Sequence, residues 1–148
     1  AKPVLTTNPT EKLLTNGIRG SLKYSDFEWC SWTDNDSVSF TIDLLKPEVL
    51  NTLTLGCITN NGMAIHKPAS VKVEVSDDNS KFREAAMQSF TPKEIFREGN
   101  FIENLSLKLG GIQGRYVRVS AKGPGVCPAS HVRSGQASRI FFDEVMLE

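Results

Sequence analysis

The sequence contains no apolar run approaching about 18 residues and no signal-peptide pattern. A membrane-spanning helix needs about 20 predominantly apolar residues, so none is expected. The chain of 148 residues begins at Ala1 rather than Met, and we therefore interpret it as a piece of a longer protein. The residues that would decide its compartment then lie outside it.

The sequence also lacks an excess of either positive or negative charge. Seventeen Lys and Arg residues stand against seventeen Asp and Glu residues, and no long run of either sign occurs. Nucleic-acid binding draws most of its affinity from clustered basic residues that neutralise phosphates. Nucleic acid is therefore not an expected partner.

Cysteine is scarce, with Cys30, Cys57 and Cys127 scattered along the chain. Three cysteines are too few for a disulfide framework, although an oxidising compartment would allow one of three pairings. The alternative, which the sequence favours, is that all three are small buried hydrophobes.

No segment sustains a helical period near 3.6, whereas strand-like alternation recurs. In residues 37–44, Val38, Phe40, Ile42 and Leu44 share one face, which is typical of a half-buried strand. Further strands are expected at residues 50–58, 71–75, a run from Phe82, 105–109 closed by Gly110 and Gly111, 115–120 and 139–147. About seven or eight strands at this spacing predict an all-β sandwich.

The length of the chain fits a single domain, which buries roughly two-thirds of its unfolded surface at this size. We find no internal repeat or linker within residues 11–148 and interpret them as one domain. Residues 1–10, with Pro3 and Pro9, are interpreted as a lead-in segment.

Three long loops, at residues 20–36, 59–68 and 123–138, interrupt the strand pattern. An irregular segment as long as the last is uncommon in a compact domain and is usually functional. Its His, Arg and small polar residues suit the gripping of a polar ligand. If the three loops share one edge of the sandwich, they form a shallow aromatic and polar site. The candidate ligand-binding residues are Tyr24, Trp29, Trp32, Asn60, His66, His131 and Arg133.

Each candidate also has a structural explanation. Trp29 and Trp32 are three residues apart, so an extended backbone turns them to opposite faces, and Trp29 is the one expected in the core. His131 is expected to be exposed, with a ligand contact and a loop-pinning hydrogen bond equally weighted. His66 is more often a solvated loop residue at such a position.

Arg133 offers a planar fork of donors to vicinal hydroxyls, yet a surface Arg usually has no specific role. Asn60 and Asn61, which precede Gly62, are most economically explained as a turn.

A set of short motifs in a fixed order resembles the discoidin-like, coagulation factor 5/8 type C domains. The motifs are Leu14 to Gly20, a following Trp, residues 40–44, Pro68 before residues 71–78, Phe82, residues 115–119 and the run Phe142-Asp143-Glu144. The loop Gly125-Val126-Cys127-Pro128 with His131 is most similar to C-terminal domains of bacterial chitobiases, the beta-N-acetylhexosaminidases of glycoside hydrolase family 20. Those domains are related to family 32 carbohydrate-binding modules.

The resemblance implies a jelly-roll sandwich of the galactose-binding type in a secreted or periplasmic glycosidase. It implies a non-catalytic module that weakly binds N-acetylhexosamine or galactose-type glycans. Ala64, Ser130 and Arg139 stand where we expect Trp in the relatives, and these missing aromatic residues are the reason to consider an alternative role. In that alternative the module docks on its own catalytic domain and binds no glycan.

No cofactor is required by this interpretation, but the resemblance implies a possible structural calcium. The ligands would be Asn16 and Glu144, with backbone carbonyls at Arg19 and Ser21. The family usually has Asp where this chain has Asn16, which removes a carboxylate, and calcium affinity rises with the number of carboxylates. The alternative is that the site is empty or replaced by a hydrogen-bond bridge.

Catalysis is not expected. Asp143 and Glu144 are adjacent on an expected strand and should point to opposite faces, which prevents them from flanking one glycosidic bond. Cys127 and His131 lack a third orienting residue, and the few His and Cys residues fall short of a zinc set.

Membrane binding through a loop tip needs apolar residues ringed by basic ones. Phe27, Met63 and Ile65 with Lys67 are a minimal version of that arrangement. A membrane is therefore not an expected partner.

Overall fold

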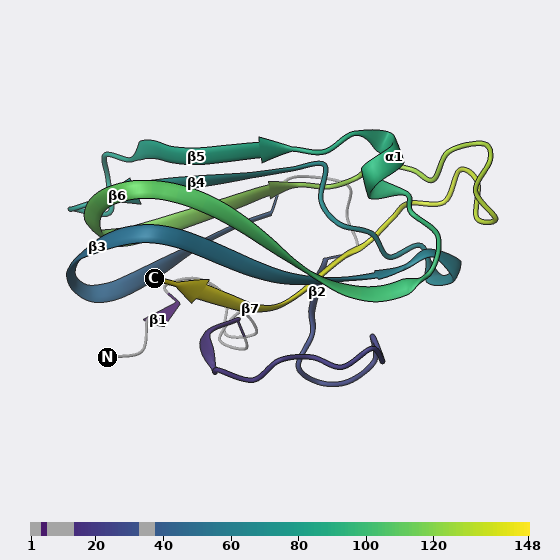
Figure 1. Cartoon of the computed structure of the whole chain (residues 1–148), viewed down its shortest axis with the longest axis horizontal. Helices are drawn as coiled ribbons and strands as arrows, with labels where there is room; N and C mark the ends of the chain where they lie inside the picture. Colours follow the sequence, from purple (N-terminus) through teal and green to yellow (C-terminus); the bar gives the residue numbers. More distant parts are fainter. Residues whose placement is uncertain (1–3, 6–13, 33–37) are drawn as a thin grey trace.

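In the computed structural model, residues 4–5, 14–32 and 38–148 are described, and they form an all-β fold (Figure 1). The strands are β1 (Val4–Leu5), β2 (Cys30–Trp32), β3 (Val38–Asn60), β4 (Ser70–Ser76), β5 (Arg83–Ser89), β6 (Asn100–Lys122) and β7 (Ile140–Leu147). The short helices η2 (Asn61–Met63) and α1 (Pro92–Ile95) lie in connections between strands.

The strands pair antiparallel in the order β2-β7-β3-β6-β4-β5, and β1 pairs with β3. Figure 1 shows two layers, with β4 and β5 in one and β7 in the other. The long strands β3 and β6 run through both layers, so one continuous ladder folds over itself as a sandwich. The predicted β-sandwich is confirmed.

A bulge at Gly110 and Gly111 lets β6 pass from one layer to the other. Leu50 pairs with Ile112 but Thr52 pairs with Lys108, so three residues of β6 lie opposite one of β3. Both glycines have positive φ, 69° and 74°, which costs glycine little. The strand end expected at these glycines is therefore wrong, because the bulge bends the strand without ending it.

A second irregularity, between Asp43 and Glu48, joins the two strands expected at residues 37–44 and 50–58 into one. Leu45 takes a positive φ of 71°, and its N–H donates to Asp43 Oδ1 at 2.8 Å. The Arg115 guanidinium holds the same carboxylate at 2.7 and 2.8 Å, which keeps the pKa of Asp43 below its usual value. This ion pair fixes the bend.

The core lies between the layers and follows the alternation read from the sequence. Its fully buried side chains include Phe40, Ile42, Leu53, Leu55, Val71, Val73, Val75, Val117, Val119, Ile140 and Phe142. Burial of each such side chain contributes about 1.5–3 kcal/mol. The alternating residues on β3, β4 and β6 therefore supply most of the stability.

All three cysteines are buried free thiols, which confirms their interpretation as small hydrophobes. Burial raises the pKa of the Cys57 thiol to about 12. Most of the expected lead-in, residues 1–10, lies outside the described residues, but Val4–Leu5 form β1 against β3.

Candidate ligand-binding site

A pocket of about 330 Å³ opens at one end of the sandwich, where η2, the segment after α1 and the loop at residues 123–138 meet. Figure 1 shows that loop, in yellow-green, beside α1. The lining residues are Asn61, Phe96, Glu98, Pro128, Ser130, His131 and Val132. Two of the three expected loops thus share one edge, joined by a segment that was not expected.

Asn61 occupies the centre of the pocket's hydrogen-bond network. Its Oδ1 accepts from His66 Nε2 at 2.9 Å and from His131 Nε2 at 2.7 Å. His131 Nδ1 accepts the Arg133 N–H at 2.8 Å, so the single proton of a neutral His131 is on Nε2. Two imidazoles therefore orient the Asn61 amide, and no described residue accepts from its Nδ2.

His66 is completely buried, so its expected place as a solvated loop residue is wrong. Its Nδ1 lies 2.6 Å from Ser138 Oγ, and burial lowers its pKa to about 4. The neutral ring donates from Nε2 to Asn61, which leaves Nδ1 as an acceptor for the Ser138 hydroxyl. The Ala64 carbonyl lies 3.2 Å from the same Ser138 Oγ and competes for its one proton. His66 thus supports the pocket from beneath and does not line it.

Phe96 supplies an aromatic ring to the pocket wall. Its ring lies 4.9 Å from the His66 ring and 6.5 Å from the His131 ring, both edge-on. The one-turn helix α1 positions it: Thr91 Oγ1 accepts the Glu94 N–H, and the Glu94 carboxylate accepts the Thr91 N–H. This capping box, with Pro92 at the first helical position, is the sequence signal that locates the missed segment.

Glu98 and Ser130 complete the polar lining. Neither side chain makes a hydrogen bond or ion pair with a described residue. The pocket therefore presents a carboxylate, a hydroxyl and the Asn61 amide nitrogen around one aromatic ring. This combination suits a polar ligand that has one apolar face.

Arg133 lies outside the pocket and ties its walls together. Its Nε donates to the Gly62 carbonyl, and its Nη1 donates to Gln136 Oε1 at 3.2 Å. Arg139 likewise donates to the Met63 carbonyl at 3.1 Å. These two guanidinium groups join η2 to the loop at residues 123–138 and to Arg139, the residue that follows the loop.

The first expected loop makes no contribution to the pocket from its described residues. Trp29 is only 7% exposed, packs with Ile58, Ile65 and Phe141, and donates from Nε1 to the Ser21 carbonyl at 3.0 Å. The ligand contact considered for Trp29 is corrected, and its expected core position is confirmed.

Three other candidates also lie elsewhere. Tyr24 packs edge-on against Phe141 at 6.0 Å, and Trp32 packs against Phe142 at 5.5 Å. Asn60 pairs through its backbone with Ile65 and forms the expected turn. Among the seven ligand-binding candidates, His131 lines the pocket directly.

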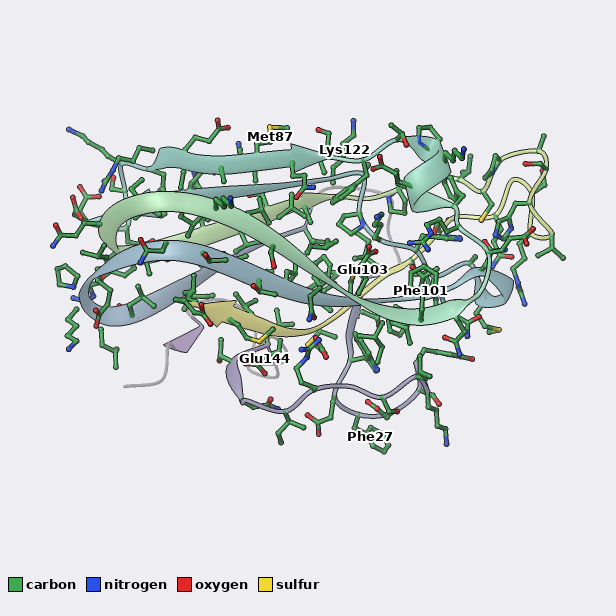
Figure 2. All side chains as sticks on the ribbon, in the orientation of Figure 1. Phe27, Met87, Phe101, Glu103, Lys122 and Glu144 are labelled. Carbon is green, nitrogen blue, oxygen red and sulfur yellow. The ribbon has the colours of Figure 1, made fainter. Side chains whose placement is uncertain are left out.

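The side chains of Asp143 and Glu144 both contact the segment at residues 17–20. The sequence had led us to expect them on opposite faces of the strand. Cys57 pairs with Phe142 and Leu55 with Val145, so a bulge places both acids opposite one residue. Asp143 Oδ2 accepts the Gly20 N–H at 2.9 Å, and Glu144 Oε2 accepts the Gly17 N–H at 3.0 Å. The side chains are buried beneath that segment, and Figure 2 shows Glu144 between it and β7.

The residues at the expected calcium position do not fit calcium. Hydrogen-bond donors face one oxygen of each carboxylate, and Arg19 Nε donates to Asp143 Oδ2 at 2.8 Å. Asp143 Oδ1 has no hydrogen-bond partner among the described residues, but it is a single oxygen. Asn16 Oδ1 accepts the Ile18 N–H at 2.8 Å, and the Ser21 carbonyl is taken by the Trp29 ring. Calcium needs six to eight oxygen ligands. The arrangement is the hydrogen-bond bridge considered as the alternative, and burial raises the pKa of Glu144 within it.

No group of three or more His, Cys, Asp and Glu side chains suited to a metal occurs among residues 14–32 and 38–148. The apolar loop tip considered for membrane contact does not form as described, because Ile65 is fully buried and Lys67 is 5% exposed. Lys67 Nζ lies 3.3 Å from Glu103 Oε1 and 4.4 Å from the centre of the Phe90 ring. Phe27, in contrast, is 92% exposed and projects from the first loop in Figure 2. None of the described helices has the length and apolar character required to cross a bilayer.

The fold is similar to solved structures of low sequence identity. CpGH89CBM32-6, produced by Clostridium perfringens, is 18% identical with a TM-score of 0.59, over 99% of this chain and 91% of that one. The C-terminal domain of a chitobiase from Bacteroides fragilis is 16% identical with a TM-score of 0.54, over 93% and 78%. CpGH89CBM32-5 from Clostridium perfringens, in complex with GalNAc-beta-1,3-galactose, is 14% identical with a TM-score of 0.57, over 99% and 93%.

A search of curated proteins found no match. The F5/8 type C domain family matches residues 6–134, which include both long bent strands and most of the pocket. The chain therefore belongs to the F5/8 type C domain family.

Proposed function

We propose that this chain is a non-catalytic carbohydrate-binding module and that its pocket binds a glycan weakly. The observation that carries the proposal is the set of uncommitted polar groups on Asn61, Glu98 and Ser130 around the Phe96 ring. A solved structure of similar fold contains a bound disaccharide, GalNAc-beta-1,3-galactose, which supports the same class of ligand here.

The chemistry of a sugar ring matches this arrangement. One face of a pyranose is apolar and packs on an aromatic ring, while its hydroxyl groups take directed hydrogen bonds. We assign the packing face to Phe96 and the hydrogen bonds to Asn61 Nδ2 and Ser130 Oγ. The pocket volume of about 330 Å³ is at the small end of ligand sites, so a short contact of one or two sugar units is expected.

We infer that the ligand is of the N-acetylhexosamine or galactose type, with dissociation constants in the micromolar to millimolar range, roughly 4 to 8 kcal/mol. Residues 11–148 then act as one accessory domain of a secreted or periplasmic glycosidase of the chitobiase kind. The similarity in fold to a chitobiase C-terminal domain supports that parentage.

Titration of the chain with N-acetylglucosamine, N-acetylgalactosamine and galactose, followed by calorimetry or NMR shifts, tests the proposal. Ser130→Ala is expected to weaken binding about threefold to tenfold, because one hydrogen bond to the sugar is lost. Ser89→Ala, on exposed β5, is the matched control and should leave binding unchanged. Flat titrations against every sugar would instead favour the alternative role, docking on the parent catalytic domain.

A further inference from the structure

We propose that the pocket discriminates among sugars by charge: Glu98 disfavours acidic sugars and favours sugars that carry a free amino group. This inference rests on the proposed function, since it assigns the ligand class of the same site. It is based on the distribution of charge around the pocket.

Glu98 is an exposed carboxylate at the pocket rim that makes no ion pair with a described residue. No Lys or Arg lines the pocket in the described part of the chain. The carboxylate charge of Glu98 is therefore not neutralised by the lining and acts on any ligand that enters the pocket.

The nearest arginines in sequence are directed to other partners. Arg133 and Arg139 donate to carbonyls of η2, and Arg97, the neighbour of Glu98, lies over the Phe101 ring at 4.6 Å. None of the three guanidinium groups is therefore placed to receive a sugar carboxylate.

His131, the other titratable group in the lining, adds no positive charge in this arrangement. Its Nδ1 accepts an amide N–H, which requires a lone pair, and its Nε2 donates to Asn61. Lys67 is buried against Glu103 and Phe90, and the exposed Lys93 of α1 is not among the lining residues. The lining is therefore neutral apart from Glu98.

The ligand class follows from electrostatics at a half-open site. A sugar ammonium gains a charge-assisted hydrogen bond to the carboxylate, whereas a uronate is repelled by it. Because solvent screens an exposed carboxylate, the expected discrimination is modest, about threefold to tenfold between an amino sugar and its N-acetylated form. It should diminish as salt is raised.

The test uses three tetramers at about pH 6, where a sugar amine is protonated. They are the tetramer of β-1,4-linked glucosamine, the tetramer of β-1,4-linked N-acetylglucosamine and a tetramer of galacturonate. The wild-type chain is expected to bind glucosamine tightest and galacturonate weakest. Glu98→Gln should bring the glucosamine and N-acetylglucosamine affinities together and improve galacturonate binding, while Glu84→Gln, on exposed β5, should change neither.

The outcomes separate the two proposals. If the N-acetylglucosamine tetramer binds but Glu98→Gln leaves the ratio of the glucosamine affinity to the N-acetylglucosamine affinity unchanged, charge selection is overturned. Glycan binding then still stands. Galacturonate affinity equal to that of glucosamine in the wild-type chain would also overturn it. If none of the tetramers binds, and the simple sugars do not bind either, both proposals fail.

Discussion

His66 shows how a single buried side chain organises this module. It is sequestered beneath the pocket, yet both ring nitrogens have partners, Asn61 on one side and Ser138 on the other. A buried polar group is stable only when its hydrogen bonds are made. The ring therefore links the stability of the fold to the geometry of the pocket.

Because the pKa of His66 is lowered from 6.5 to about 4, folding should depend on pH. The unfolded chain takes up the proton first, so the stabilisation is complete above about pH 6.5 and is lost as pH falls toward 4. The difference corresponds to about 3 kcal/mol. Urea unfolding at pH 7.5, 5.5 and 4.5 measures it.

His66→Gln is the comparison for that measurement. The variant should be less stable at neutral pH but should lose less stability on acidification than the wild-type chain. An identical pH slope in the two proteins would assign the effect to other groups.

At the residue scale, the sequence indicated which residues matter better than it indicated what each of them does. His131 was a candidate for both a ligand contact and a loop-pinning bond, and it makes the bond while lining the pocket. His66 was misjudged because Ser138, its partner, lies 72 residues away in the chain. Hydrogen bonds between distant loops leave no local pattern to read.

At the scale of elements, the bulge in β7 decides what two acids do. It turns Asp143 and Glu144 toward residues 17–20, whose N–H groups and Arg19 side chain donate to Asp143 Oδ2 and Glu144 Oε2. Asp143 Oδ1 is buried and has no hydrogen-bond partner among the described residues. The strand itself was predicted from alternation, but an inserted residue reverses the faces after it. The orientation of Glu144 was therefore beyond a periodicity argument.

Removing the Arg19 guanidinium should destabilise the fold. Arg19→Met leaves the buried Asp143 carboxylate without its cation, and we expect a loss of about 2–3 kcal/mol, reduced from the fully buried case because Arg19 is 38% exposed. Chemical denaturation measures the loss. Arg83→Met is the control, because its ion pair with Asp77 is exposed on both sides and should contribute little. Equal effects of the two variants would contradict the assignment.

At the scale of the whole molecule, the sandwich was predictable because alternation is local and repeats along β3, β4 and β6. The passage of two strands through both layers was not, since it depends on bulges at Gly110 and near Leu45. Of the pocket, the two loops that carry Asn61 and His131 were predicted, but the segment with Phe96 and Glu98 was not. That segment follows α1, which is one turn long and therefore shows no helical periodicity in the sequence.

The residues described at the expected calcium position do not fit the ion, and this leads to a prediction for the intact module. Neither excess calcium nor a chelator should shift the Tm, because a ligand stabilises a fold only if it binds the folded state. Differential scanning calorimetry with 5 mM calcium and with EGTA, at matched ionic strength, is the measurement. A rise of several degrees with calcium alone would show that oxygen ligands assemble despite the donors that face Asp143 and Glu144.

The pair of imidazoles that holds Asn61 also bears on how quickly and how tightly a ligand can be captured. An amide that is already locked in place loses little rotational freedom on contact, which spares about 0.5–1.5 kcal/mol of ordering entropy. Capture then needs no reorientation of the Asn61 side chain, which favours association in one step at the rate of encounter.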